Sequence, residues 1–421
     1  MQNTAAARRR FQILSLDGGG LKGLFTAAYL AEWEAHTGRR VVDAMDLIAG
    51  TSAGGIIALG LGAGYRAREL VDFFREHGRT IFPEEPIEAV GRVRQALGSR
   101  YAAEPLEFVL DEYFGDRRLG DSCARLVIPA YHAESGIHIF KTSHHPRLRV
   151  DWRERMAVVA RATGAAPTFL PPLALEPGMR LIDGGVWANN PVQIAVTEAL
   201  GCLGQPQGCV AALRIGTTTE AVRKDRYPEN LRAIGPDAVA LFAEIMMRGQ
   251  SQAASGGVRQ LLGPDRFVEV DPVVAPADYR LDRLSEDLVG MAKAGFRKTV
   301  SELGDKHFLE HRATVFSASH TDAEHDAHGL HRPRSSECAR RRGRGAAGPH
   351  ADPARPRRRA LRGRRRVPRG AGIAARALLA GSCSPRGPSR SARPPSRSGG
   401  TSSIWISCVS CRFHLAPIPP T

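Results

Sequence analysis

The sequence predicts an α/β fold in which helices flank a mostly parallel sheet. The first observation is that short apolar runs are followed by glycine-rich turns and then by segments of helical periodicity. The second is that two such units already occupy residues 11–64. Since strands that alternate with helices usually pair in parallel, this order is typical of α/β proteins.

The first unit begins with a buried strand at residues 11–16, FQILSL. The glycine-rich turn DGGGLKG follows at residues 17–23. Residues 24–37 then have apolar positions on one helical face, and Gly38 is a typical residue at which such a helix ends. A strand, a glycine turn and a helix in this order predict a site that binds an anion with backbone amides.

The second unit is residues 45–62, MDLIAGTSAGGIIALGLG, around which the rest of the chain is organised. A short apolar run ends at Gly50, and a helical apolar segment begins after Ser52. Gly50, Ser52 and Gly54 form the pattern G-x-S-x-G, which is typical of a nucleophile elbow. The alternative is a glycine-rich helix start in which Thr51 or Ser52 is the N-cap.

The remaining elements complete one domain. Residues 67–114 have amphipathic helical periodicity, interrupted by prolines at 83 and 86. A third glycine turn, DGG at 183–185, follows a short apolar run. We expect strands at 125–131, 137–141, 179–182 and 209–215, and helices at 152–161, 192–200, 237–248 and 284–303.

Charge separates the chain into a body and a tail. The chain has 59 Lys and Arg against 43 Asp and Glu, but residues 318–421 alone hold 21 Arg, no Lys and five acidic residues. Their 12 prolines and lack of periodicity predict disorder. We therefore expect an N-terminal extension (1–10), one domain (11–316) and an Arg/Pro-rich tail (317–421). Since this composition is typical of a GC-rich gene read out of frame, we hypothesise that the tail is a frameshifted extension.

The seven cysteines are sparse, and no pair in the body has metal-ligand spacing. They predict a reducing compartment and no metal site. No apolar run approaches the length of a membrane span, so we expect a cytoplasmic protein.

The three glycine turns suggest one catalytic crevice. Each turn follows a predicted strand, and the carboxyl ends of parallel strands lie along one edge of a sheet, so the turns can converge there. Ester hydrolysis by serine needs a base, amides that hold the oxyanion, and room for the acyl group. Ser52, Asp183 and the amides of residues 18–20 fill these roles.

Three alternatives stay open. A dinucleotide site would use the same glycines with an acidic residue such as Glu34, Asp43 or Asp46. An esterase that acts on soluble esters with a Ser-Asp-His triad would add His307 or His311 after Asp183. The basic tail could bind nucleic acid, although it has no recognisable module. Deletion of residues 318–421 discriminates, because only the nucleic-acid interpretation predicts loss of activity.

Together these stretches resemble the patatin-like phospholipases over about residues 11–310. The resemblance implies a three-layer fold and a Ser-Asp dyad of Ser52 and Asp183. It also implies an oxyanion hole (Gly18, Gly19, Gly20, Lys22 and Gly23), a nucleophile elbow (Gly50, Thr51, Ala53 and Gly54) and an Asp-Gly-Gly motif completed by Gly184 and Gly185. Lys22 departs from the arginine that many members have.

Within that family, three stretches are similar to bacterial members of cyclic-oligonucleotide anti-phage systems: FQILSLDGGGLKGLFTAAYLAEWE, FKTSHHPRLRVDW and DGGVWANNP. That similarity implies membrane phospholipid as substrate, a cyclic dinucleotide second messenger as activator and no other cofactor. We expect no specific nucleic acid partner, because the tail has few aromatic residues and no recognisable module. It implies peripheral action at the inner membrane and leaves the oligomeric state open. Six apolar residues near predicted loops suggest a lip that dips into the bilayer: Phe73, Phe74, Ile81, Phe82, Phe169 and Leu170.

Overall fold

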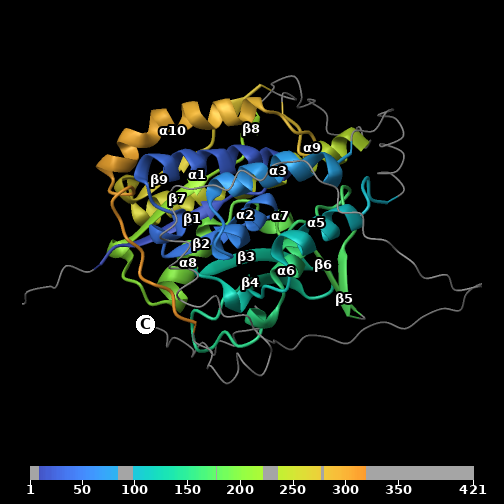
Figure 1. The fold of residues 1–421 in the computed structure, drawn as a ribbon, viewed down its shortest axis with the longest axis horizontal. Coiled ribbons are helices and arrows are strands. Elements are labelled where there is room, and N and C mark those ends of the chain that lie inside the picture. The colour runs from blue at the N-terminus through green and yellow to red at the C-terminus, as the bar shows by residue number, and fades with distance from the viewer. Residues whose placement is uncertain (1–8, 84–97, 177, 221–235, 276–278, 319–421) are drawn as a thin grey trace, which may run out of the picture. The chain divides into compact units, whose positions relative to one another are not determined.

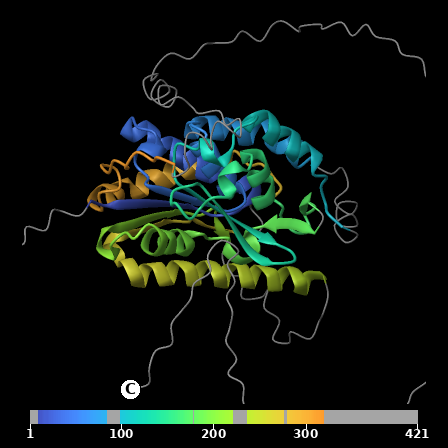
Figure 2. The same ribbon diagram turned by 90° about the horizontal axis from the view of Figure 1, so that it is seen from below.

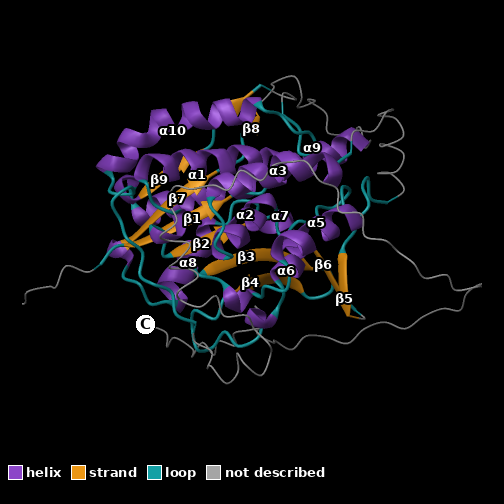
Figure 3. Cartoon of the chain, viewed as in Figure 1, coloured by secondary structure: helices purple, strands orange, loops and turns teal. Residues whose placement is uncertain are grey.

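The computed structural model describes residues 9–83, 98–176, 178–220, 236–275 and 279–318. Most of the predicted tail, residues 319–421, and residues 1–8 of the predicted extension lie outside the described residues. Within the described part the fold has three layers, with helices on both faces of a central sheet (Figures 1 and 3). This confirms the predicted fold class.

The central sheet has eight strands in the order β5-β6-β3-β2-β1-β7-β9, with β4 also paired to β3. The neighbouring strands β3, β2, β1, β7 and β9 pair in parallel. β4 and β6 are antiparallel to β3, and β5 is antiparallel to β6. A short parallel pair, β8 and β10, lies apart from it. The strands are β1 (Phe11–Leu16), β2 (Leu47–Gly50), β3 (Leu126–His132), β4 (Gly136–Lys141), β5 (Leu173–Glu176), β6 (Met179–Asp183), β7 (Val210–Ile215), β8 (Thr219–Glu220), β9 (Phe267–Val270) and β10 (Val273–Val274).

Each face of the sheet carries its own apolar core. On one face, β1 contributes Leu14 and Leu16 to a large cluster with α1, α2, α3, α5, α6 and α10. On the other face, Phe11 and Ile13 pack with α8 and α9, which runs along the far side of the sheet (Figure 2). The helices are α1 (Gly23–Thr37), α2 (Ala53–Gly62), α3 (Ala67–Ile81), α5 (Glu104–Phe114), α6 (Met156–Thr163), α7 (Gly185–Ala188), α8 (Val192–Thr197), α9 (Pro236–Leu262) and α10 (Asp287–Asp305).

The central elements follow from local sequence. All six residues of β1 are buried, including the polar Gln12 and Ser15, as expected for a strand inside a parallel sheet that is covered on both faces. The ten residues of α2 are also all buried, because the segment is apolar on every face. α1 ends where predicted, at Gly38 with φ 65°. No helix within the described residues combines the length and the apolar character that a bilayer span requires.

Candidate active site

The Ser52 turn is a strained connection between β2 and α2. Ser52 has φ 54° and ψ −125°, a region that residues other than glycine seldom occupy. A Cβ atom added at Gly50 would lie 2.2 Å from the carbonyl oxygen of Gly54, and one added at Gly54 would lie 2.4 Å from that of Leu16. Neither position accepts a side chain, so the turn has the geometry of a nucleophile elbow.

Two threonines hold this turn in place. The Ser52 amide donates to Thr163 Oγ1 at 3.0 Å, and the Thr163 hydroxyl donates to the Pro129 carbonyl oxygen at 2.6 Å. The Thr51 hydroxyl donates to the carbonyl oxygen of Ala188 at 2.6 Å. The serine turn is therefore tied to α6, to β3 and to the segment that follows Asp183. The sequence analysis did not identify Thr163. This residue is the last of α6 and belongs to no recognisable motif.

Asp183 lies at the end of β6, where its carboxylate interacts with the side chain of Ser52. Its carboxylate also accepts a hydrogen bond from the Gly185 amide at 2.6 Å, and the residue is only 4% exposed. Burial raises the pKa of Asp183 to about 6, although the Ser52 side chain and the Gly185 amide oppose this shift. A carboxylate with that pKa is ionised at neutral pH yet basic enough to accept a proton.

The route by which Asp183 reaches Ser52 differs from the prediction. We expected all three glycine turns to follow parallel strands, but β6 is antiparallel to β3, with Asp183 opposite Ala130. Because β3 extends beyond the end of β2, β6 returns along that extension and ends beside the serine turn. The three turns still meet at one edge of the sheet.

The glycine turn after β1 lies against Ser52, because a Cβ added at Gly18 would be 3.1 Å from the serine Cβ. The amide of Gly18 donates to the Asn189 carbonyl oxygen at 3.0 Å, and those of Lys22 and Gly23 donate back to the turn. Within the described residues, the amides of Gly19 and Gly20 donate no hydrogen bond. Of the five residues predicted for the oxyanion hole, Gly19 and Gly20 are therefore the two whose backbone amides could donate to a substrate.

The side chain of Lys22, one of the five residues predicted for the oxyanion hole, is buried. It is 9% exposed, and its Nζ donates to the Thr218 carbonyl oxygen at 3.2 Å. Thr218 has φ 85°, an unusual conformation for threonine. Lys22 thus connects the glycine turn to the segment after β7.

The turn after β7 supports the glycine turn, and sequence analysis missed it. The Gly18 carbonyl oxygen accepts hydrogen bonds from the Thr217 hydroxyl at 3.0 Å and the Asn189 side-chain amide at 3.4 Å. A Cβ added at Gly19 would lie 2.1 Å from Thr217 Oγ1. The available signal was position, since a strand at 209–215 places its following turn at this edge of the sheet.

An apolar pocket adjoins Ser52. It holds about 440 Å³ of space, part of it open to solvent, and its lining is almost wholly apolar: Gly20, Leu21, Ser52, Ala53, Ile56, Phe73, Phe74, Gly78, Ile81, Phe82, Leu106, Gly164 and Leu170. Five of the six residues predicted to form a membrane lip line this pocket. Phe73, Phe74, Ile81 and Leu170 are each at most 5% exposed, so the prediction of an exposed lip is wrong.

The alternative with a histidine finds no support in the contacts. His311 Nε2 lies 2.6 Å from Asp46 Oδ2, and Asp46 precedes β2 whereas Ser52 follows it. His311 is therefore at the opposite edge of the sheet. The side chain of His307 is 71% exposed and lies near Glu310.

The dinucleotide alternative is also unsupported. The Glu34 carboxylate accepts hydrogen bonds from the amides of Val41 and Ala67, at 3.0 and 3.1 Å. Asp46 similarly accepts from the Gln12 amide at 2.8 Å. Both carboxylates thus have structural partners away from the glycine turn.

One group in the described part of the chain has residue types that bind metals. Atoms of His144, Glu198 and Cys202 lie within 4.8 Å of one another. The Glu198 carboxylate forms hydrogen bonds with His144 Nε2 at 3.0 Å and with Lys141 Nζ at 2.7 Å. It also interacts with the Cys202 thiol. The donors are thus already engaged in an ion-pair cluster beyond the end of β4, remote from Ser52.

The fold and the arrangement around Ser52 are those of an acyl hydrolase. The model of the family described as patatin-like phospholipase matches residues 14–196. A cGAMP-activated phospholipase of Pseudomonas aeruginosa is 34% identical over 314 residues, which cover 72% of this chain and 92% of that protein. Two proteins of the same name are 39% identical (Vibrio cholerae) and 36% identical (Escherichia coli), over 45% and 46% of this chain and 58% and 57% of their own lengths. The chain belongs to the patatin-like phospholipase family.

Proposed function

We propose that this protein hydrolyses acyl ester bonds of membrane phospholipids, with Ser52 as nucleophile and Asp183 as general base. The observation that carries the proposal is that the Ser52 side chain interacts with the buried Asp183 carboxylate. The serine side chain also borders an apolar pocket. A serine, a base and an adjoining acyl site are what ester hydrolysis requires.

The proposed reaction has two steps. Asp183 accepts the Ser52 proton while Oγ attacks the ester carbonyl carbon, and the amides of Gly19 and Gly20 stabilise the oxyanion. The tetrahedral intermediate then collapses, the lysophospholipid leaves with the proton from Asp183, and an acyl-serine remains. In the second step Asp183 deprotonates a water molecule that attacks the acyl-serine. The fatty acid leaves and Ser52 recovers its proton.

The apolar pocket is the proposed acyl site, and Gly78 leaves room in it. Gly78 lies inside α3, one turn after Phe74 and one turn before Phe82, and all three line the pocket. Glycine inside a helix costs about 1 kcal/mol relative to alanine. A Cβ added there would already lie 3.1 Å from Leu21.

Gly78→Leu is therefore expected to shorten the acyl chain that the protein accepts. Hydrolysis of p-nitrophenyl palmitate should fall by about tenfold or more relative to p-nitrophenyl butyrate, because each excluded methylene loses about 0.8 kcal/mol of burial. The matched control is Gly290→Leu, since Gly290 is in α10 and has no atom within 4 Å of an added Cβ. An equal loss for both esters would contradict the assignment of the pocket.

Activation by a cyclic dinucleotide is part of the proposal. It is supported by three relatives whose names describe them as cGAMP-activated phospholipases. We place the reaction at the cytoplasmic side of the inner membrane, in an anti-phage response. The cyclic dinucleotide would then control an enzyme that damages the inner membrane of the cell that produces it.

Two measurements test the function. Purified protein is incubated with phosphatidylglycerol and phosphatidylethanolamine vesicles, with and without cGAMP, and released fatty acid is quantified. A fluorophosphonate, which labels activated serines, is then located by mass spectrometry. Release that requires cGAMP and a label on Ser52 support the proposal. A label elsewhere, or no release under either condition, would refute it.

A further inference from the structure

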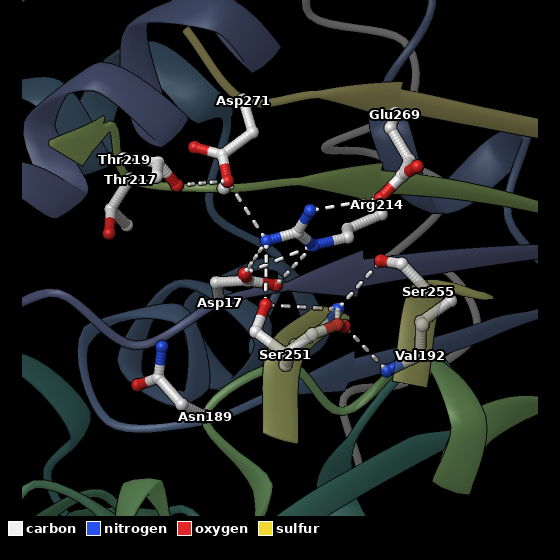
Figure 4. A network of polar contacts seen from close by, with 12 residues as sticks. Asp17, Asn189, Val192, Arg214, Thr217, Thr219, Ser251, Ser255, Glu269 and Asp271 are labelled. Carbon is white, nitrogen blue, oxygen red and sulfur yellow. Dashed lines mark hydrogen bonds and ion pairs between the residues drawn. The ribbon is translucent and has the colours of Figure 1, made fainter. Parts of the chain in front are cut away.

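Arg214 is a buried cation surrounded by three carboxylates (Figure 4). It lies on β7, and its Nε is 3.2 and 3.1 Å from the two oxygens of Asp17. Its Nη1 is 3.0 Å from Glu269, and its Nη2 is 3.0 Å from Asp271. One guanidinium thus connects the end of β1 to β9 and to the residue that follows β9.

The first connection leads to the glycine turn. Asp17 directly precedes Gly18, and its backbone amide donates to the Ile215 carbonyl oxygen at 3.1 Å. The ion pair with Arg214 holds the side chain of Asp17. The orientation of the Gly19 and Gly20 amides therefore depends on an anchor that Arg214 supplies.

The second connection leads through α9 to the aspartate turn, the segment at residues 183–190 that begins with Asp183. Arg214 Nη2 donates to Ser251 Oγ at 3.1 Å. Asn190, in the segment after Asp183, donates from Nδ2 to the Ser251 carbonyl oxygen at 3.1 Å and to Ser255 Oγ at 3.0 Å. Because residues four apart share one face of a helix, one face of α9 contacts both Arg214 and the aspartate turn.

The chemistry of this position requires arginine. Burial alone would lower the pKa of Arg214, but Asp17, Asp271 and Glu269 outweigh it and raise the pKa, so the side chain stays charged. A planar guanidinium offers five donors in a fixed arrangement, whereas a lysine offers one compact ammonium group. Lysine can preserve the charge without bridging all of these partners at once.

We propose that Arg214 is a positioning residue that sets the glycine turn against the Ser52–Asp183 pair. It is not among the residues that line the pocket, so it acts through Asp17 and α9 rather than on the substrate. This inference rests on the proposed function. It assigns an influence on the catalytic rate to a side chain that does not line the pocket.

The test compares Arg214→Lys and Arg214→Met with the wild type, and Arg125→Lys is the matched control. Arg125 is a partly buried arginine at the other edge of the sheet, where it donates to the Asp46 carbonyl oxygen at 3.2 Å. We expect kcat to fall about 100-fold in Arg214→Met and about tenfold in Arg214→Lys, since small misplacements of catalytic groups have effects of this size. KM should change less than twofold. Fluorophosphonate labelling of Ser52 should slow in proportion to kcat. The apparent pKa of about 6 that Asp183 gives to the pH profile of kcat/KM should not change.

Melting temperatures identify any variant that fails to fold, and Arg214→Lys, which keeps the charge, is then decisive. A folded Arg214→Lys with wild-type kcat would overturn the positioning role, as would a rise in KM with unchanged kcat. Failure of the proposed function has a different signature, because the wild type itself would then neither label at Ser52 nor release fatty acid. That result would remove both proposals.

Discussion

Ser52→Ala is expected to lower the rate of fatty-acid release from phospholipid vesicles by about 10⁴-fold or more. Without the hydroxyl no acyl-serine can form, and only the oxyanion amides and the pocket still favour the reaction. The readout is fatty acid released by cGAMP-treated protein at neutral pH. Fluorophosphonate labelling should disappear in the same variant.

The matched control is Ser135→Ala, because Ser135 is an exposed serine in the turn between β3 and β4. It should retain full activity. If Ser52→Ala kept more than about one tenth of the wild-type rate while folded, the nucleophile would have to be another residue.

Asp183→Asn is expected to lower kcat by about 10³- to 10⁴-fold with little change in KM. Asparagine can still accept the hydrogen bond from the Gly185 amide, so the turn is preserved, but it cannot take the Ser52 proton. In the wild type, kcat/KM should rise with pH and level off above a pKa of about 6, since Asp183 is active only when ionised. The residual activity of Asp183→Asn should lack this dependence.

Asp151→Asn is the matched control, because burial also raises the pKa of Asp151 to about 6. Asp151 accepts from the Lys141 amide near the end of β4, away from Ser52. It should leave the pH profile unchanged. If Asp183→Asn kept its activity while replacement of His307 and His311 abolished it, a histidine would be the base.

The elements around the site were predictable because their signals are local. The strands at 11–16 and 47–50 are short, mostly apolar segments that lead into glycine-rich turns, and Ser52 stands between glycines that the turn requires. The direction of β6 was not predictable, because a short apolar run reads the same in a parallel or an antiparallel pair. Pairing with β3 involves residues about 50 positions away, which no local pattern encodes.

Hydrogen bonds and packing limited the prediction of the site in the same way. Nothing in DGGGLKG indicates that the Gly18 amide is occupied by Asn189, which lies far away in the sequence. The apolar face of α3 was visible as a pattern, but Phe73 and Phe74 could have faced a membrane or a core. Only the packing against α2 and α5 shows that they enclose a pocket.

The left-handed backbone of Ser52 sets chemistry against folding. A residue held in that region costs about 1–3 kcal/mol, and the surrounding threonines and glycines must offset it. Glycine would adopt the same backbone with little strain. Ser52→Gly is therefore expected to relieve this strain while it removes the hydroxyl on which the proposed reaction depends.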